Sequence, residues 1–244
     1  MYAFYKPFGH HVWGDSIGLT WLSLVKAVLK HGKVTYDEGR QRKSLQNVVF
    51  QIENFDLPDK LLEKYANKKN IDSLVYITFE GNEMFDFDVN PSFNPGAKSY
   101  HARITEGKMI DYVVKRLGLI PESKKAVMSF IHWDDYRAIL DRPYDDYLPC
   151  HTTIQFRLLE EDLKYKMNVI THFRSIDAFQ KSCGDFTVTA MLAGKVKEEL
   201  SKTLKLPIEF GSMMGVITDA HIYEECYSDA EKVIISAEKE IKIN

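Results

Sequence analysis

The chain has 244 residues, of which 45% are hydrophobic and 27% charged, which is enough for one substantial core and argues against disorder. The net charge of −3 gives no overall attraction to nucleic acid or to a membrane surface. We therefore expect a single domain over residues 1–244, no nucleic-acid partner, and any phosphate to be held by a local cluster of basic side chains.

The first half of the chain is predicted to begin with an amphipathic helix that runs to about His31. Asp15 or Ser16 can cap its start, apolar residues recur on one face, and Gly32 is placed as a stop. The further elements expected in this half are, in chain order, a polar turn over 37–44, a strand over 47–52, a helix over 57–67 opened by Pro58, a helix or a strand over 71–79, and a loop over 82–99.

The second half is predicted to combine helices with most of a sheet. An amphipathic helix is expected over 108–117, closed by Gly118, and a long helix over 186–204. Short β-rich runs separated by turns are typical of neighbouring strands, and they cover 126–131, 152–159, 166–173 and 213–218. Together the elements predict an α+β fold with a large mixed or antiparallel sheet packed with helices.

The three cysteines, at positions 150, 183 and 226, have no short paired spacing. An odd number without such spacing favours neither a disulfide framework nor a zinc site, so we expect no metal and a reducing, cytoplasmic location. The N-terminal residues lack a basic stretch followed by an apolar one, which predicts no signal peptide. No apolar run approaches 18 residues, so no membrane partner is expected.

Three blocks of sequence carry the chemical signal. They are Leu148-Pro-Cys-His-Thr-Thr-Ile-Gln-Phe156, Phe173-Arg-Ser-Ile-Asp177 and Asp219-Ala-His-Ile-Tyr223. A lone cysteine is more often a small buried hydrophobe than a nucleophile. These blocks, in this order and at these separations, nevertheless resemble the thymidylate synthase family. The resemblance is good from about Tyr100 to Tyr223 and weaker before that.

The resemblance implies that Cys150 is a nucleophile that attacks C6 of a pyrimidine nucleotide. A thiolate suits this task because C6 is a weak electrophile and sulfur is a strong nucleophile near neutral pH. Arg174 is expected on the adjacent strand, facing Cys150, where a guanidinium would lower the pKa of the thiol and also bind a phosphate oxygen. The alternative for Arg174 is a surface salt bridge.

Several phosphate ligands follow from the same resemblance. Ser175 adds a hydroxyl donor beside the arginine. Lys124 and Lys125 stand where the family usually carries two arginines that reach across a homodimer interface to the partner's phosphate. Lysines supply charge without a bidentate fork, and in the cytidylate hydroxymethylase branch a lysine here goes with ribonucleotides. In the polar turn, either Arg40 or Arg42 serves as a phosphate ligand, or both belong to a solvated charge run.

The remaining family positions concern the sugar, the base and the folate. His221 and Tyr223 are expected to hydrogen-bond the sugar 3′-hydroxyl, because a spacing of two directs both to one side of an extended segment. Tyr100 matches a tyrosine in the polar network beside the base, Gln155 is expected to orient groups behind the nucleophile, and Asp177 is expected to line the folate side. The family's catalytic glutamate has four candidates in this sequence, namely Glu63, which is nearest by order, and Glu53, Glu80 and Glu83.

Asp185 is the residue expected to choose the base. It lies eleven residues after Arg174, where thymidylate synthases carry an asparagine that pairs with uracil. Cytosine presents the reverse pattern, and a protonated carboxyl can donate to its N3 and accept from its amino group. Mispairing would leave a buried polar group without a hydrogen bond, at a cost of roughly 1–3 kcal/mol in binding free energy. The alternative is that Asp185 simply caps a helix that begins at Phe186.

These residues together predict a cytidylate 5-hydroxymethylase. Cys150 adds to C6, the C5 carbon takes the one-carbon unit of 5,10-methylenetetrahydrofolate, and water completes the hydroxymethyl group. CMP is favoured over dCMP, and the enzyme is expected to be a homodimer with the phosphate site shared across the interface. Two alternatives stay open: a thymidylate synthase that acts on dUMP, and a non-catalytic nucleotide- or RNA-binding module, against which the intact Pro149-Cys150-His151 argues.

Overall fold

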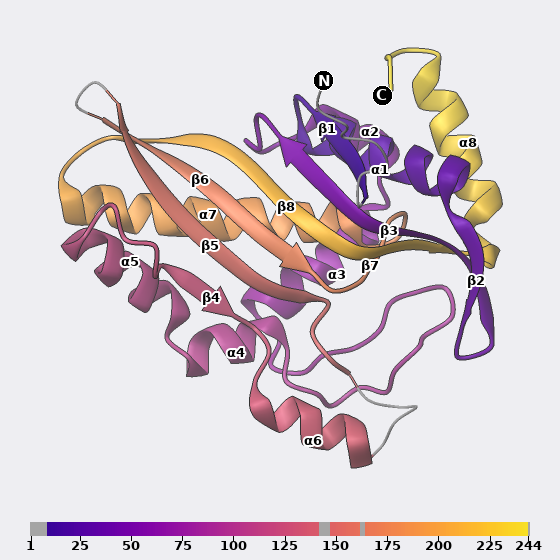
Figure 1. Cartoon of the computed structure of the whole chain (residues 1–244), viewed down its shortest axis with the longest axis horizontal. Coiled ribbons are helices and arrows are strands. Elements are labelled where there is room, and N and C mark those ends of the chain that lie inside the picture. The colour runs from indigo at the N-terminus through magenta and orange to yellow at the C-terminus, as the bar shows by residue number, and fades with distance from the viewer. Residues whose placement is uncertain (1–8, 142–146, 162–163, 244) are drawn as a thin grey trace, which may run out of the picture.

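A mixed sheet forms the centre of the molecule (Figure 1). The computed structural model describes residues 9–141, 147–161 and 164–243. Within these residues an eight-stranded sheet has the order β1-β3-β8-β6-β5-β4, with β2 paired to β3 and β7 paired to β8. The strands are β1 (His10–Gly14), β2 (Lys33–Asp37), β3 (Arg40–Ile52), β4 (Val127–Ser129), β5 (His151–Glu161), β6 (Lys164–Phe173), β7 (Ile176–Asp177) and β8 (Ile208–Tyr223).

Helices cover one face of this sheet, and α7 runs along the back of the central strands (Figure 1). Phe50, Phe173 and Phe186 are fully buried between α7 and the sheet, with Phe50 and Phe186 4.7 Å apart between ring centroids. Burial of such rings stabilises the fold by about 25 cal/mol per Å² of apolar surface. The helices are α1 (Ile17–His31), α2 (Lys60–Tyr65), α3 (Lys68–Phe79), α4 (Tyr100–Glu106), α5 (Met109–Leu119), α6 (Trp133–Asp141), α7 (Ser182–Leu204) and α8 (Tyr227–Glu238).

The pairing of the strands brings three chain segments to one end of the sheet. β5 and β6 are antiparallel, and the start of β5 at His151 pairs with the end of β6 at Phe173. β6 and β8 are parallel, so β8 ends on the same side. A parallel pair needs a crossover, and α7 supplies it. The α+β architecture expected from the sequence is therefore confirmed, with a mixed sheet.

Several expected boundaries were wrong for identifiable reasons. The polar turn over 37–44 is mostly a β-hairpin, because Glu38 and Gly39 both take positive φ angles (49° and 82°) and form a tight two-residue connection between β2 and β3. The helix expected over 57–67 ends at Tyr65, and α3 then starts after its own cap, Asn67. Gly118 lies inside α5 and does not end it. No helix among the described residues is long and apolar enough to cross a membrane.

Candidate active site

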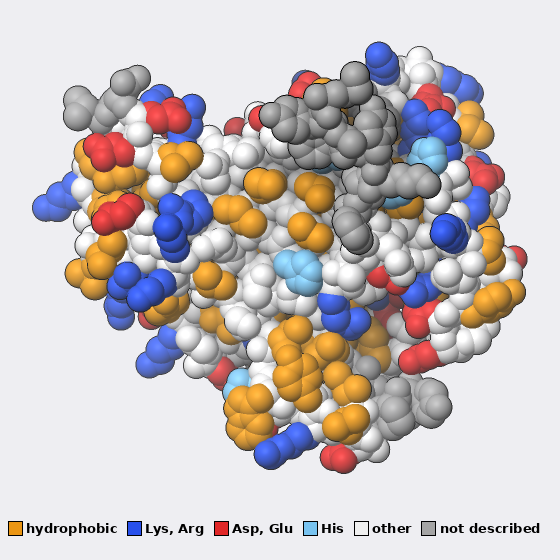
Figure 2. Space-filling view, in the orientation of Figure 1, with side chains coloured by type: hydrophobic (Ala, Val, Ile, Leu, Met, Phe, Trp, Pro, Cys, Tyr) orange, Lys and Arg blue, Asp and Glu red, His pale blue; other side chains and the backbone are white. Residues whose placement is uncertain are grey.

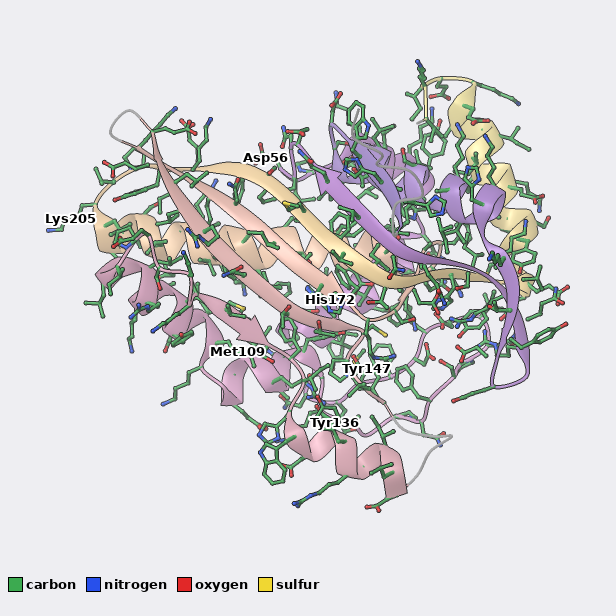
Figure 3. All side chains as sticks on the ribbon, in the orientation of Figure 1. Asp56, Met109, Tyr136, Tyr147, His172 and Lys205 are labelled. Carbon is green, nitrogen blue, oxygen red and sulfur yellow. The ribbon has the colours of Figure 1, made fainter. Side chains whose placement is uncertain are left out.

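A cavity of about 600 Å³ opens at the end of the sheet where β6 and β8 finish and β5 starts. The segment between α3 and α4, residues 80–99, forms its opposite wall. Tyr147, which leads towards β5, lies below the ends of the central strands (Figure 3). The side chains that line the cavity and carry chemistry are Asp37, Glu38, Arg40, Asp88, Cys150, Arg174, Ser175, Asp177, Lys181, His221 and Tyr223.

Cys150 and Arg174 lie side by side at the floor of this cavity. The Arg174 Nη2 atom is 3.8 Å from the Cys150 Sγ atom, and the Arg174 backbone N–H donates to the Cys150 carbonyl at 2.9 Å. The guanidinium also donates to the carbonyls of Leu148 (2.6 Å) and Pro149 (3.1 Å), which fixes its plane. Arg174 is thus a partner of the thiol and not part of a surface salt bridge.

The charge balance at the thiol differs from the expectation. Burial raises the pKa of the Cys150 thiol, and the positive charges of Arg174 and Lys181 only partly oppose this effect. The carboxylates of Asp185 and Asp88 raise the same pKa further. In the free protein burial therefore favours the thiol over the thiolate.

Ser175, His221 and Tyr223 meet on the β8 side of the cavity. The Ser175 Oγ and His221 Nδ1 atoms are 3.4 Å apart, and the Tyr223 hydroxyl donates to Asp37 at 3.1 Å. Burial lowers the pKa of His221 to about 3, so its ring is neutral and offers one donor and one acceptor. This set of hydroxyl and imidazole groups can bind a sugar.

The structure separates Arg40 from Arg42. Arg40 lines the cavity, stacks on the Tyr223 ring at 3.6 Å and binds Glu225 at 2.5 Å. Its Nε and Nη1 atoms are buried and have no hydrogen-bond partner among the described residues. Arg42 does not line the cavity, and its guanidinium binds Asp219 at 2.8 Å. Of the two, Arg40 is the arginine placed to take an anion.

Asp185 is buried behind these groups. It lies in the first turn of α7, whose N-cap is Lys181, so the alternative that Asp185 caps a helix starting at Phe186 is wrong. Its side chain makes no hydrogen bond to any described residue, and burial raises its pKa to about 7. It is not among the residues that line the cavity, but its charge raises the pKa values of both Cys150 and Tyr100.

Tyr100 and Asp177 take fixed positions around the nucleophile. The Tyr100 hydroxyl accepts a hydrogen bond from the His151 backbone at 3.1 Å, which places the ring under the start of β5. The carboxylate of Asp177 lines the cavity and accepts hydrogen bonds from the backbone of Phe179 (2.9 Å) and Gln180 (2.7 Å). The turn into α7 is therefore built around Asp177.

The structure does not bring every expected residue to the cavity. Lys124 and Lys125 are exposed just before β4, outside the lining of the cavity. Gln155 donates to the Lys124 carbonyl at 2.7 Å, so the prediction that it orients groups behind the nucleophile was wrong. All four candidate glutamates are exposed, and none lines the cavity: Glu53, Glu63, Glu80 and Glu83.

Sequence reasoning missed a cluster of charges in the opposite wall. Lys181 is 2.9 Å from Asp86 and 3.1 Å from Asp88. Burial alone would lower the pKa of Lys181, but the two carboxylates outweigh it and raise that pKa above its ordinary value. The signal in the sequence was the alternation of aromatic and acidic residues over 85–88, within a segment interpreted as a loop.

The cavity combines a thiol beside a guanidinium with sugar-binding and anion-binding groups, as in an enzyme that attacks a nucleotide covalently. A family model described as thymidylate synthase matches residues 81–243, and the chain belongs to that family. No curated protein matches the chain. The family assignment makes it a folate-dependent one-carbon transferase that acts on a pyrimidine nucleotide. Among the described residues there is no group of three or more His, Cys, Asp or Glu side chains arranged to hold a metal.

Proposed function

We propose that this enzyme hydroxymethylates C5 of a cytidine monophosphate, with CMP favoured over dCMP and 5,10-methylenetetrahydrofolate as co-substrate. The observation behind the proposal is the buried carboxyl of Asp185, which lies outside the lining of the cavity but acts through its charge on Cys150 and Tyr100 and takes no hydrogen bond from a described residue. A carboxyl in this state is a ready partner for the polar edge of a base.

The protonation of Asp185 supports cytosine in particular. Because burial raises its pKa to about 7, a large fraction of the carboxyl is neutral at physiological pH. A neutral carboxyl donates to N3 of cytosine and accepts from the amino group, whereas uracil offers a donor at N3. The ionised carboxyl, which is also populated near pH 7, accepts from the amino group of cytosine and from a protonated N3, whereas uracil O4 would face a second acceptor and stay unpaired.

The other residues then take the roles that their positions support. Cys150 adds to C6 beneath the base, with Arg174 and Lys181 as the nearby positive charges that favour its thiolate. Arg40, Arg174 and Ser175 bind the phosphate, and two donors of Arg40 are free for it. His221 and Tyr223 bind the sugar, Tyr100 supports the nucleophile strand, and Asp177 lines the folate side. The co-substrate supplies the one-carbon unit.

A homodimer would give Lys124 and Lys125 a role. In the described part of the chain no helix covers the face of the sheet opposite α7 (Figure 1), and hydrophobic side chains gather on that face (Figure 2). Met214 and Val216 on the central strand β8 and Val127 on the edge strand β4 are 37–41% exposed, which makes an apolar patch on this face. A second copy on this face would bury them and bring the lysine pair of one protomer towards its partner's cavity. Sedimentation at micromolar concentration tests this association.

The decisive experiment incubates the protein with methylenetetrahydrofolate and CMP, dCMP or dUMP in turn. We expect tetrahydrofolate and a hydroxymethylated nucleotide from CMP, and less product from dCMP. Asp185→Asn should shift the ratio of kcat/KM for cytidylate to that for uridylate by about 10- to 100-fold towards uridylate, as expected for one mispaired buried group. An exposed change of the same type, Asp72→Asn, is the control.

A thymidylate synthase acting on dUMP is the second candidate, because the family match is equally compatible with both reactions. The same incubation separates the two, since dihydrofolate formed with dUMP and no product from CMP would refute the hydroxymethylase. A non-catalytic binding module would leave every nucleotide unchanged, and the position of Arg174 beside the Cys150 thiol argues against it.

A further inference from the structure

Asp88 combines three features: it is buried, one of its carboxylate oxygens has no hydrogen-bond partner among the described residues, and it lines the cavity. Its side chain is 2% exposed and lines the cavity that holds Cys150. One carboxylate oxygen, Oδ2, is 3.1 Å from the Lys181 Nζ atom. The other, Oδ1, is buried and has no hydrogen-bond partner within the described part of the chain. A buried acceptor in this state needs either a proton of its own or a donor from a ligand.

Asp86 provides an internal comparison, because it binds the same lysine in a different way. Its Oδ1 atom is 2.9 Å from Lys181 Nζ and accepts from the Asp88 backbone at 3.1 Å. Its Oδ2 atom accepts from the backbone (2.7 Å) and hydroxyl (2.9 Å) of Ser92. Both oxygens are thus satisfied inside the loop, and Asp86 does not line the cavity. Asp86 is an anchor of the loop, whereas Asp88 retains an unused oxygen.

The chemistry at C5 requires a group that moves a proton. When the Cys150 sulfur bonds to C6, the electron pair of the C5–C6 double bond has to be taken up, and in the absence of folate C5 takes a proton. Reversal removes a proton from C5 and breaks the sulfur–carbon bond. The net result is exchange of the C5 hydrogen with solvent. None of the four candidate glutamates reaches the cavity to serve this step.

We propose that Asp88 is the acid–base group that exchanges the proton at C5 of the pyrimidine. The neutral carboxyl gives its proton to C5 as sulfur bonds to C6, and the resulting carboxylate takes a proton back as that bond breaks. Lys181 holds the carboxyl in place through Oδ2 and leaves Oδ1 for the substrate. The inference rests on the proposed attack at C6 but not on the choice of base.

The electrostatics of Asp88 suit an acid–base group near neutral pH. Burial raises its pKa to about 7, Lys181 opposes this shift, and the neighbouring carboxylates of Asp177 and Asp86 add to it. Both the neutral and the ionised form are therefore populated at pH 7, which is the condition for efficient proton transfer in both directions.

The test measures release of tritium from C5-labelled nucleotide without folate, for the full chain and for Asp88→Asn, Asp88→Glu and Asp86→Asn. We expect Asp88→Asn to slow exchange by about 100-fold or more, with nucleotide affinity within about threefold of the original. Asp88→Glu should restore part of the rate, and the limb near pH 7 in the rate profile should disappear in Asp88→Asn. Asp86→Asn should keep most of the exchange rate, with thermal melting confirming that each variant is folded.

The comparison of the two asparagine variants decides the matter. Exchange at the original rate in Asp88→Asn overturns the proposal, and so does an equal loss in both variants, because that outcome reduces Asp88 to a support for Lys181. If only dUMP exchanges, the cytidylate assignment fails while the role of Asp88 is still measured on dUMP. If no nucleotide exchanges with the unaltered protein, both proposals fail.

Discussion

The two walls of the cavity are held in place by different forces. On the sheet wall, Cys150 and Arg174 follow from the pairing of β5 with β6, and the neighbouring His151 ring stacks on Phe173 at 4.2 Å within the core. On the loop wall, residues 80–99 have no strand pairing beyond one isolated bridge. That wall is attached by the two salt bridges of Lys181 and by hydrogen bonds from the Val89 backbone to Gln180 and from Asn90 to Glu225, both at 3.0 Å. Apolar side chains of the same segment also pack against the core: Met84, Phe85, Phe87 and Phe93.

The contrast teaches that the nucleophile and the proton-handling acid depend on separate parts of the fold. Backbone ladders and packed rings position the thiol, so a change of one side chain there alters the chemistry and leaves the shape intact. The loop wall depends on side-chain contacts, among them a few buried charges, and removing one of these charges changes the shape of the cavity as well as its chemistry. Substitutions in the two walls should therefore differ in their balance of activity loss and stability loss.

The largest effect is expected from Cys150→Ser on the sheet wall. A hydroxyl at this position is a far weaker nucleophile than a thiolate, so turnover and C5 exchange should both fall by on the order of 10⁴-fold or more. Nucleotide affinity and melting temperature should change little, because the ladder that positions the residue is unaltered. Stopped-flow binding and thermal melting measure these two quantities, and a serine variant with near-normal turnover would contradict the role of the thiol.

Asp185→Asn is expected to change the pH dependence of stability. The pKa of Asp185 is raised to about 7 by burial, so the folded protein keeps a proton that the unfolded chain releases above about pH 4. The stability that comes from this tighter proton binding is fully present below the pKa of Asp185 in the unfolded chain, about 4, and is lost as the pH rises through the folded pKa of about 7. Asn has no such dependence. The variant should therefore gain stability relative to the original across this range, by up to about 4 kcal/mol at pH 8 for a shift of about three pKa units.

Urea unfolding at pH 5 and pH 8 measures that difference. The same measurement tests whether Lys181 pairs with Asp185 as well as with Asp86 and Asp88. A salt bridge from Lys181 to Asp185 would lower the pKa of the Asp185 carboxyl, and Asp185→Asn would then lose stability at pH 8. A variant that is less stable than the original at pH 8 would show that Asp185 is ionised and paired. The pH 5 measurement serves as the internal reference, since most of the expected gain is absent there.

The sheet wall could be predicted from the sequence, and the loop wall could not. The blocks around Cys150, Arg174 and His221 lie on or next to strands with a strong apolar pattern. The pairing of β5 with β6 and of β6 with β8 then brings these three blocks together. Asp86 and Asp88 carry no motif, and their function arises from contact with Lys181, 95 and 93 positions away along the chain. A contact at that distance depends on tertiary packing, which local patterns do not encode.

The same limit explains the misplaced side chains. Gln155 is close to Cys150 in sequence, but strand alternation puts it on the open face of the sheet, where it binds the Lys124 carbonyl. The choice between Arg40 and Arg42 likewise required the tertiary structure. The two lie on the same side of β3, but Arg42 is held by Asp219 while Arg40 lines the cavity. Residue type and spacing alone were equal for the two.

Lys181→Met should loosen the loop wall and also raise the pKa of the Cys150 thiol, because Lys181 is one of the two cations that favour its thiolate. It leaves Asp86 and Asp88 buried without their cation, so we expect the free energy of unfolding to fall by about 3 kcal/mol, in the range for breaking a buried ion pair. The KM for the nucleotide should rise as the loop loosens. Lys181→Arg keeps the charge and should recover much of the stability, whereas Lys68→Met removes only an exposed pair with Asp72 and serves as the control.

A stable Lys181→Met protein with normal KM would show that the loop is held by other contacts. Hydrogen exchange of the backbone amides over 84–93 gives a second measure, because loosening should raise exchange there before it changes the strands. Loss of protection across β5 and β6 instead would mean that the two walls are not independent.

The smallest effect separates two arginines on one strand of the sheet wall. Arg40 has two buried donors without partners among the described residues, so Arg40→Gln should raise the KM for the nucleotide by about 10-fold, as for one charged hydrogen bond of about 1.5 kcal/mol. Arg42 binds Asp219 at 2.8 Å and Asp37 at 3.6 Å, so Arg42→Gln should leave KM within about threefold and lower stability by about 1 kcal/mol. Steady-state kinetics with urea unfolding measures both variants. Equal KM values for the two would mean that the phosphate lies elsewhere. Arg40 lines the cavity and has two donors without partners among the described residues, whereas Arg42 lies outside the lining and has one.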